Sequence, residues 1–210
     1  MSSHIQALEA NPADPALRSN LITAGQNLTQ AIRQTYTNVA DVQRNADDQL
    51  RFSVDQVNTY LAQIADVNKK IRSSEVNEQE NLGLRDERDR LITELSKKLS
   101  FEKVIDSQGE VSLSLSNGFA LVTGESYHTL DVTDAPSFGS FPLGLDGGTL
   151  GTIVWDADST AGTTHVNLEN LIAAGSGELA GLLQVRGIYR SGASTSFDAV
   201  GDLPDIASRV

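Results

Sequence analysis

The sequence predicts an α+β protein. We expect an elongated helical bundle, made of a long helix, an antiparallel hairpin helix and C-terminal helices, with an inserted β-rich domain. Three observations lead there. Apolar residues recur three and four positions apart through much of the first hundred residues, which is the period of a helix face. Apolar residues and serines alternate from Val111, which is the period of a strand. A helical pattern returns at Ser176.

The composition excludes several classes of protein. A formal net charge of −12 repels phosphate backbones and anionic lipid surfaces, so we expect neither nucleic-acid nor membrane binding. The chain has no cysteine, which excludes disulfides, thiolate chemistry and cysteine-ligated zinc. Residues 1–4 lack the basic and apolar regions of a Sec signal peptide.

A long helix is predicted to begin at Pro15, with Asp14 as its N-cap, because both residues are favoured at those positions. Neither proline nor glycine occurs between Gln26 and Asn81. A break between Asp41 and Asp48 is an open alternative. The apolar stripe of this helix consists of Leu17, Leu21, Ala24, Leu28 and Ile32, and then of Leu50, Val54, Val57, Leu61, Ile64, Val67 and Ile71.

A second helix, roughly Glu80–Leu99, follows a polar turn at residues 73–77. The short connection predicts that it folds back antiparallel onto the first helix. The second helix is too short to cover the whole apolar stripe of the first helix, so the stripe over residues 15–45 needs a further partner. The packed stripe of the second helix is Leu84, Arg88, Leu91 and Leu95, and its solvated face is Asp86, Arg90, Glu94 and Lys98.

Arg88 is a charge on the packed stripe of the second helix. A guanidinium against a partner helix needs hydrogen bonds to offset its desolvation. We therefore expect Arg88 to bond with Asp89 or with groups around Asn58 and Asn68.

The β-rich part begins after Ser100. Asn117-Gly118 predicts a two-residue type I′ hairpin turn, with positive φ at both residues. Residues 134–151 are rich in Gly, Pro and Phe and predict a loop, and residues 156–162 predict another. The predicted strands are 101–105, 111–115, 119–123, 127–132, 152–155 and 165–168.

The last helical pattern opens at Ser176-Gly177-Glu178 and ends near Arg190. Residues 203–210 predict the start of another helix. The domain assignment that follows is a discontinuous helical domain, residues 1–100 and 176–210, and a β-rich domain, residues 101–175.

A catalytic, metal or cofactor site is not predicted. The histidines His4, His128 and His165 lie in different predicted elements without a partner at metal-ligand spacing. Asp156 and Asp158 lack the ligand run of a calcium loop. We therefore expect no catalytic residue, no metal and no cofactor, and a protein that is not an enzyme.

Residues 81–99 resemble the Leu-x-Asp-x-Arg-Asp-x-Leu helix of the flagellar hook-associated protein 1 family, the hook–filament junction proteins of bacteria. The residues on that pattern are Leu84, Asp86, Arg88, Asp89 and Leu91. Further segments resemble the family in the right order: Asn11–Arg18, Val57-Asn58, Val67-Asn68 with Ile71, Gly109–Gly124 with Asn117-Gly118, and Ser176–Leu183. The resemblance covers most of the chain outside residues 131–175.

The resemblance implies an extracellular structural role: joining hook to filament by subunit packing in a tubular array, after export by the flagellar type III apparatus. Implied partners are the hook protein, the second junction protein and further copies. It also implies that this is a core fragment without the family's terminal coiled-coil segments. The implied structural or interaction residues are Leu84, Asp86, Arg88, Asp89, Leu91, Asn58, Asn68, Asn117 and Gly118.

Two alternatives stay open at this point. One is another axial or secreted coiled-coil protein, such as a flagellin-like subunit. The other is a surface adhesion or glycan-binding module carried by the β-rich part.

Overall fold

The computed structural model describes residues 2–74, 81–106, 109–133, 141–143, 148–155 and 166–186. The side chains of Ser2 and of residues 141–149 are outside the description. The chain forms two compact units, residues 1–42 and 43–210. Among the described residues, no helix is long and apolar enough to span a bilayer. The predicted elements at residues 156–162 and 203–210 lie outside the described residues.

The first unit holds α1 (Ser2–Ala10) and the first part of α2 (Pro15–Ser74). The predicted start of α2 is confirmed. Asp14 Oδ1 accepts from the backbone N–H of Ala16 at 2.8 Å and of Leu17 at 3.4 Å, as an N-cap does. The Arg18 guanidinium donates to the Pro12 carbonyl, which fixes the turn between the two helices.

The second part of α2 carries the core. The considered break between Asp41 and Asp48 is absent, because α2 is continuous to Ser74. Ser73 and Ser74, predicted as a turn, are its last residues, and residues 75–77 lie outside the described residues. The predicted stripe is confirmed, since each of its members in this part is buried: Leu50, Val54, Val57, Leu61, Ile64, Val67 and Ile71.

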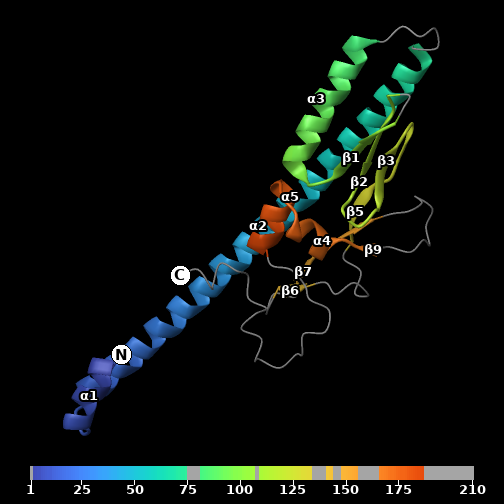
Figure 1. The fold of residues 1–210 in the computed structure, drawn as a ribbon. Helices are drawn as coiled ribbons and strands as arrows, with labels where there is room; N and C mark the ends of the chain where they lie inside the picture. Colours follow the sequence, from blue (N-terminus) through green and yellow to red (C-terminus); the bar gives the residue numbers. More distant parts are fainter. Residues whose placement is uncertain are drawn as a thin grey trace. The chain divides into compact units, whose positions relative to one another are not determined.

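Helix α3 (Leu82–Lys98) runs back alongside the second part of α2, as the short connection predicts (Figure 1). Asn81 begins it, because its side chain accepts from the Leu84 N–H at 3.2 Å. Leu91 and Leu95 face the core, and Leu84 packs at its margin. Figure 1 shows β1, β2 and β3 beside these two helices.

The β-rich part consists of antiparallel strands. A four-stranded sheet has the order β1-β2-β3-β4, a three-stranded sheet the order β5-β8-β9, and β6 pairs with β7. The strands are β1 (Glu102–Ile105), β2 (Val111–Ser114), β3 (Ala120–Thr123), β4 (Ser126–Tyr127), β5 (Leu130–Thr133), β6 (Phe141–Leu143), β7 (Gly148–Leu150), β8 (Thr152–Trp155) and β9 (Val166–Asn167). The predicted α+β class, with a long helix and an antiparallel β-rich part, is confirmed.

Two strand predictions need correction. The single strand predicted at 127–132 is two strands in different sheets, because the chain leaves the β3–β4 hairpin at His128 and starts β5 at Leu130. Part of the loop predicted at 134–151 is the β6–β7 hairpin. Its strands are three residues each and lack the alternation that would have marked them.

The predicted type I′ turn is wrong by one residue. The N–H of Gly118 donates to the Leu115 carbonyl at 2.8 Å, so Ser116 and Asn117 are the central residues of the turn. Gly118 follows them with φ +87°, and the Leu115 N–H donates to the Phe119 carbonyl at 2.8 Å. This is a three-residue hairpin loop that ends in a left-handed glycine.

The chain returns to helix earlier than predicted. Helix α4 (Glu169–Ala174) was not predicted, and α5 (Glu178–Arg186) begins where the pattern places it. The turn between them passes through Gly177, whose φ of +106° and contact with the Lys98 carbonyl leave no room for a Cβ. Residues 187–190 lie outside the described residues.

One buried apolar cluster joins side chains of α2, α3, α4 and α5 with those of β2, β3, β5 and β8. The predicted domain boundaries at residues 100 and 175 stay a prediction. Unfolding experiments can test whether the two parts, which share this core, fold separately.

Candidate functional site

Asn68 and Arg88 form a buried hydrogen-bond network between α2, α3 and the four-stranded sheet, and we call such a network a polar lock. The Asn68 Nδ2 donates to the carbonyls of Val111 (3.0 Å) and Gly124 (2.8 Å). Its Oδ1 accepts from Arg88 Nη1 at 3.1 Å. One amide thereby satisfies both donors and an acceptor while it contacts three elements, which is how a buried polar group avoids its desolvation cost.

Arg88 completes this lock. The prediction that it is buried and hydrogen-bonded is confirmed, since it is 4% exposed and its Nη1 also donates to the Gly109 carbonyl at 3.0 Å. Asp89, one of the predicted partners, is exposed and forms an ion pair with Lys103 of β1 at 2.9 Å. The two neighbouring charges of α3 thus differ in their contacts: Arg88 hydrogen-bonds buried groups, and Asp89 pairs with Lys103 at the edge of the sheet.

Asn58 is a second lock, this time on the three-stranded sheet. Its Nδ2 donates to the Leu130 carbonyl at 2.8 Å, and its Oδ1 accepts from the Leu130 N–H at 2.9 Å. The side-chain amide therefore pairs with β5 as a neighbouring strand would. Asn58 and Asn68, about three helical turns apart, each bind one sheet to the same helix.

A third lock, absent from the sequence prediction, surrounds Arg186 at the end of α5. Arg186 donates to Asp47 Oδ1 (2.5 Å), to the Gly151 carbonyl and to the Glu169 carboxylate. Arg186 is 2% exposed and Glu169 1% exposed. The cluster ties α2, α4 and α5 to the start of β8.

Further contacts hold the same cluster. Asp47 Oδ1 accepts from the Gly151 N–H at 3.1 Å, and its Oδ2 accepts from Arg51 at 3.0 Å. The Gln43 side chain donates to the Arg186 carbonyl at 3.0 Å. The sequence did hold a signal for this site, because Arg186 follows Leu179 and Leu183 at spacings of four and three, the same signal that singled out Arg88.

Two charges on the predicted solvated face of α3, Arg90 and Glu94, pair with residues three positions away. Arg90 hydrogen-bonds Glu87 three residues away, which lowers the pKa of the Glu87 carboxyl and raises that of the guanidinium. Lys97 likewise lowers the pKa of Glu94. Lys98, predicted to be solvated, keeps only 16% of its side chain exposed and pairs with Glu178 of α5 at 2.6 Å. Asp86 is exposed, as predicted.

The remaining predicted residues lie apart from the locks. Asn117 and Gly118 sit on the exposed hairpin loop. His4 is exposed, and the His128 ring lies tilted at 45° to the Trp155 ring, with 5.1 Å between their centroids. His165, Asp156 and Asp158 lie outside the described residues. Within the described part of the chain, no group of acidic, histidine or cysteine side chains could hold a metal ion.

The helical domain of flagellar hook-associated protein FlgK is the family whose sequence profile matches residues 1–206. The chain belongs to that family. The resemblance seen in the sequence is thereby confirmed, and it places this chain in a family of structural flagellar proteins.

Named relatives agree with the FlgK family assignment. The chain is 30% identical to flagellar hook-associated protein 1 of Escherichia coli K12 and 31% identical to that of Salmonella typhimurium, over 184 residues in each case. The matches cover 87% of this chain and 31% of each relative. The flagellar hook junction protein FlgK of Burkholderia pseudomallei has a similar structure, with a TM-score of 0.72 and 29% identity over 88% of this chain. The chain thus spans about a third of its relatives' length.

Proposed function

We propose that this chain is the helical core of a structural subunit that joins the flagellar hook to the filament, by packing in a tubular array outside the cell. Support comes from the family match and from relatives that are named as hook-associated and hook junction proteins. Proposed partners are the hook protein, the second junction protein and further copies of the subunit. Export through the flagellar type III apparatus is part of this proposal.

The uncovered stripe on the first part of α2 carries the proposal. Leu28, Ile32 and Val39 are 46%, 61% and 45% exposed, although they continue the spacing of the stripe that is buried beyond residue 43. An apolar helical stripe is normally covered by another element. A helix presented in this way suits packing against neighbouring helices of an assembly.

The three polar locks suit a subunit that transmits load. Because Asp47, Asn58 and Asn68 all lie on the second part of α2, this part of the helix is bonded to both sheets. Directional hydrogen bonds between buried groups resist sliding more than apolar contacts alone, since any shift leaves buried polar atoms unpaired. The expected task of the core is to keep its surfaces in a set geometry.

Motility in a deletion strain tests the function. The natural gene should restore swimming, and Leu28→Asp with Ile32→Asp should abolish it while the protein is still secreted. Gln26→Asp with Gln30→Asp is the matched control, because it adds the same two charges on the exposed opposite side of α2. Swimming that survives the double variant would contradict the role of the stripe. Full motility of the deletion strain would contradict the function.

A flagellin-like axial subunit is the nearest alternative. Electron microscopy of the deletion strain separates the two, because loss of a junction protein leaves hooks without filaments and accumulates filament subunits in the medium. Loss of a filament subunit leaves no such pool.

A glycan-binding module is the alternative from another class. The partly exposed rings of Phe119, His128 and Trp155 are the feature that favours it, since sugars stack on aromatic faces. Phe119 and Trp155 also pack against the apolar core, and the Trp155 Nε1 donates to the Ala120 carbonyl at 3.0 Å. Those contacts account for the cluster without a ligand. Binding on a glycan array that is lost in Trp155→Phe would revive this alternative.

A further inference from the structure

The four-stranded sheet has two open edges. Among the described residues, β1 pairs with β2 alone and β4 pairs with β3 alone. All residues of both strands are exposed. Val104, Ile105 and Tyr127 are 60%, 56% and 44% exposed. Such an edge is a template for pairing with another strand, and β1 has neither a proline nor a bulge that would prevent it.

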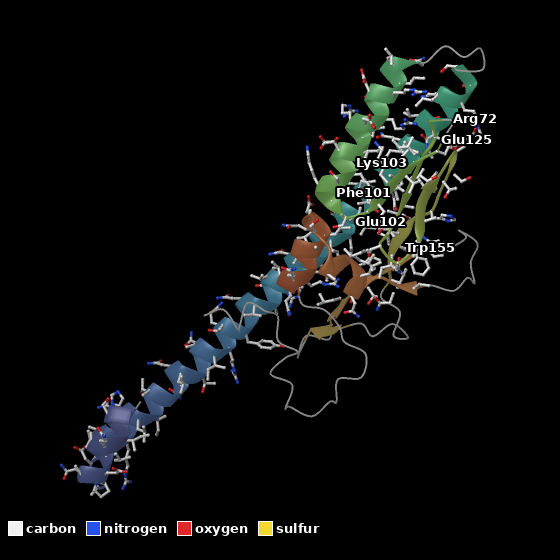
Figure 2. All side chains as sticks on the ribbon, viewed as in Figure 1. Arg72, Phe101, Glu102, Lys103, Glu125 and Trp155 are labelled. Carbon is white, nitrogen blue, oxygen red and sulfur yellow. The ribbon has the colours of Figure 1, made fainter. Side chains whose placement is uncertain are left out.

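Each edge also carries an ion pair on the same face of the sheet. At the β1 edge, Lys103 pairs with Asp89 of α3 at 2.9 Å. At the β4 edge, Glu125 pairs with Arg72 of α2 at 3.2 Å. Figure 2 shows Lys103 beside Phe101 and Glu102 on one side of the sheet, and Glu125 beside Arg72 at its far end. The two edges therefore carry opposite charges: Lys103 lies in β1, and Glu125 lies in the turn before β4.

Strand direction makes the two edges compatible. Each strand in the order β1-β2-β3-β4 is antiparallel to the next, so β4 is antiparallel to β1. A second copy, displaced sideways in the same orientation, therefore brings its β4 antiparallel to β1 of the first. This relation is head-to-tail, and head-to-tail contacts generate rings when the rotation closes and helical arrays when it does not.

We propose that β1 of one copy of this chain pairs with β4 of the next copy, which makes a sheet that continues from subunit to subunit. The inference rests on the proposed function, because it names a lateral contact within the proposed array. Its occupant is a second copy of this chain, identified by the complementary charges and strand direction of the two edges.

A register follows from the side-chain faces. Lys103 lies opposite Leu113, Leu113 opposite Val122, and Val122 opposite Tyr127. Lys103 and Tyr127 therefore lie on one face, the face that α2 and α3 cover. Glu125, in the turn before β4, is directed to the same side by its ion pair with Arg72 of α2. Placing Lys103 opposite the neighbour's Glu125 puts Phe101 opposite its Tyr127. The charges of Asp89, Lys103, Glu125 and Arg72 then alternate in sign across the contact.

A two-fold pairing of β1 with β1 is the competing arrangement. It would close at a dimer, leave the β4 edge open, and set lysine against lysine or against an apolar residue. The head-to-tail arrangement uses both edges and both ion pairs. Its area is small, so it would form in an assembly that many contacts hold together and not between separate molecules in dilute solution.

Cysteine cross-linking in assembled flagella tests the pairing, because this chain has no cysteine of its own. The natural gene with Lys103→Cys and Glu125→Cys is expressed in the deletion strain, and purified flagella are oxidised. Opposed Cβ atoms in such a pair lie close enough for a disulfide. We expect a ladder of dimers, trimers and larger products on a non-reducing gel, and no ladder from either single variant.

Glu102→Cys with Ser126→Cys is the second pair, because the same register opposes these residues and neither is part of the two ion pairs. Lys70→Cys with Lys97→Cys, exposed on α2 and α3, is the control and should give no ladder. Dimers from Lys103→Cys alone would overturn the proposal in favour of two-fold pairing. Motile cells whose flagella give no ladder from either edge pair would overturn the edge contact and leave the proposed function intact. Failure of the natural gene to restore motility would instead count against the proposed function.

Discussion

The two parts of α2 have the same apolar spacing and different surroundings. In residues 43–74 the stripe is closed over by α3 and the sheets, so Leu50, Val57 and Leu61 have no exposed surface. In residues 15–42 the stripe continues, yet Leu28 and Ile32 are open to solvent. The difference teaches that periodicity shows which face of a helix is made for packing, whereas the covering partner is supplied elsewhere. Where no described partner is present, the exposed stripe is a candidate surface for assembly.

The largest expected loss of stability comes from removing a buried arginine that contacts the second part of α2, compared with an exposed arginine on its first part. Arg186→Met should lower the free energy of unfolding by about 3–5 kcal/mol, because Asp47 and Glu169 would remain buried without their guanidinium. Urea melts would measure it. Arg33→Met, exposed on the first part of α2, is the control and should change stability by less than about 0.5 kcal/mol. A similarly small loss for Arg186→Met would mean that the third lock adds nothing.

The comparison itself is tested by one substitution in each part. Leu61→Ala should cost about 2–5 kcal/mol, because it leaves a cavity in a closed core. Ile32→Ala should cost less than about 0.5 kcal/mol in the isolated chain and should instead weaken assembly. Chemical melts measure the first effect, and motility the second. Equal losses of stability would show that both parts of the stripe are covered in solution.

Arg88 sharpens the comparison within the buried part. Arg88→Ala should cost about 2–4 kcal/mol, because Asn68 Oδ1 and the Gly109 carbonyl lose their donor inside the core. Arg90→Ala, two residues on, should leave the melting curve unchanged, since its ion pair with Glu87 lies on the surface. Urea melts of the two variants make a matched pair. Coinciding curves would place Arg88 in solvent.

The smallest expected loss of stability, in Gly118→Val, tests whether the β-rich part is a separate folding unit. Gly118→Val should cost about 1–2 kcal/mol, because a β-branched residue is strained at φ +87°. Far-UV circular dichroism follows the helices, and fluorescence of Trp155, the one tryptophan, follows β8. We expect coincident transitions, since both parts share one core. A fluorescence transition at lower urea than the helical one would support the domain boundaries at residues 100 and 175.

Much of the candidate site was predictable from local pattern. Arg88 stood out because a charge interrupts an apolar stripe, and its need for a partner follows from desolvation alone. Arg186 offers the same signal, because it follows Leu179 and Leu183 at spacings of four and three. Its partners Asp47 and Glu169 were beyond reach of any local rule, because Asp47 lies 139 residues away in the sequence. The strand prediction failed for the same reason at β4 and β5, because the apolar alternation runs on across two strands that belong to different sheets.

The sequence by itself determined helices α2 and α3, the beginning of α5, the start of α2 at Asp14-Pro15, the buried stripe and the family, because these depend on spacing and residue type within a few turns. Only the tertiary structure decided what each polar side chain on α2 binds. Asn58 and Asn68 look alike in the sequence, each after a valine, yet one pairs with β5 alone and the other joins β2, a turn and α3. The reason is physical: a hydrogen bond is set by distance and angle between groups that the chain brings together only on folding.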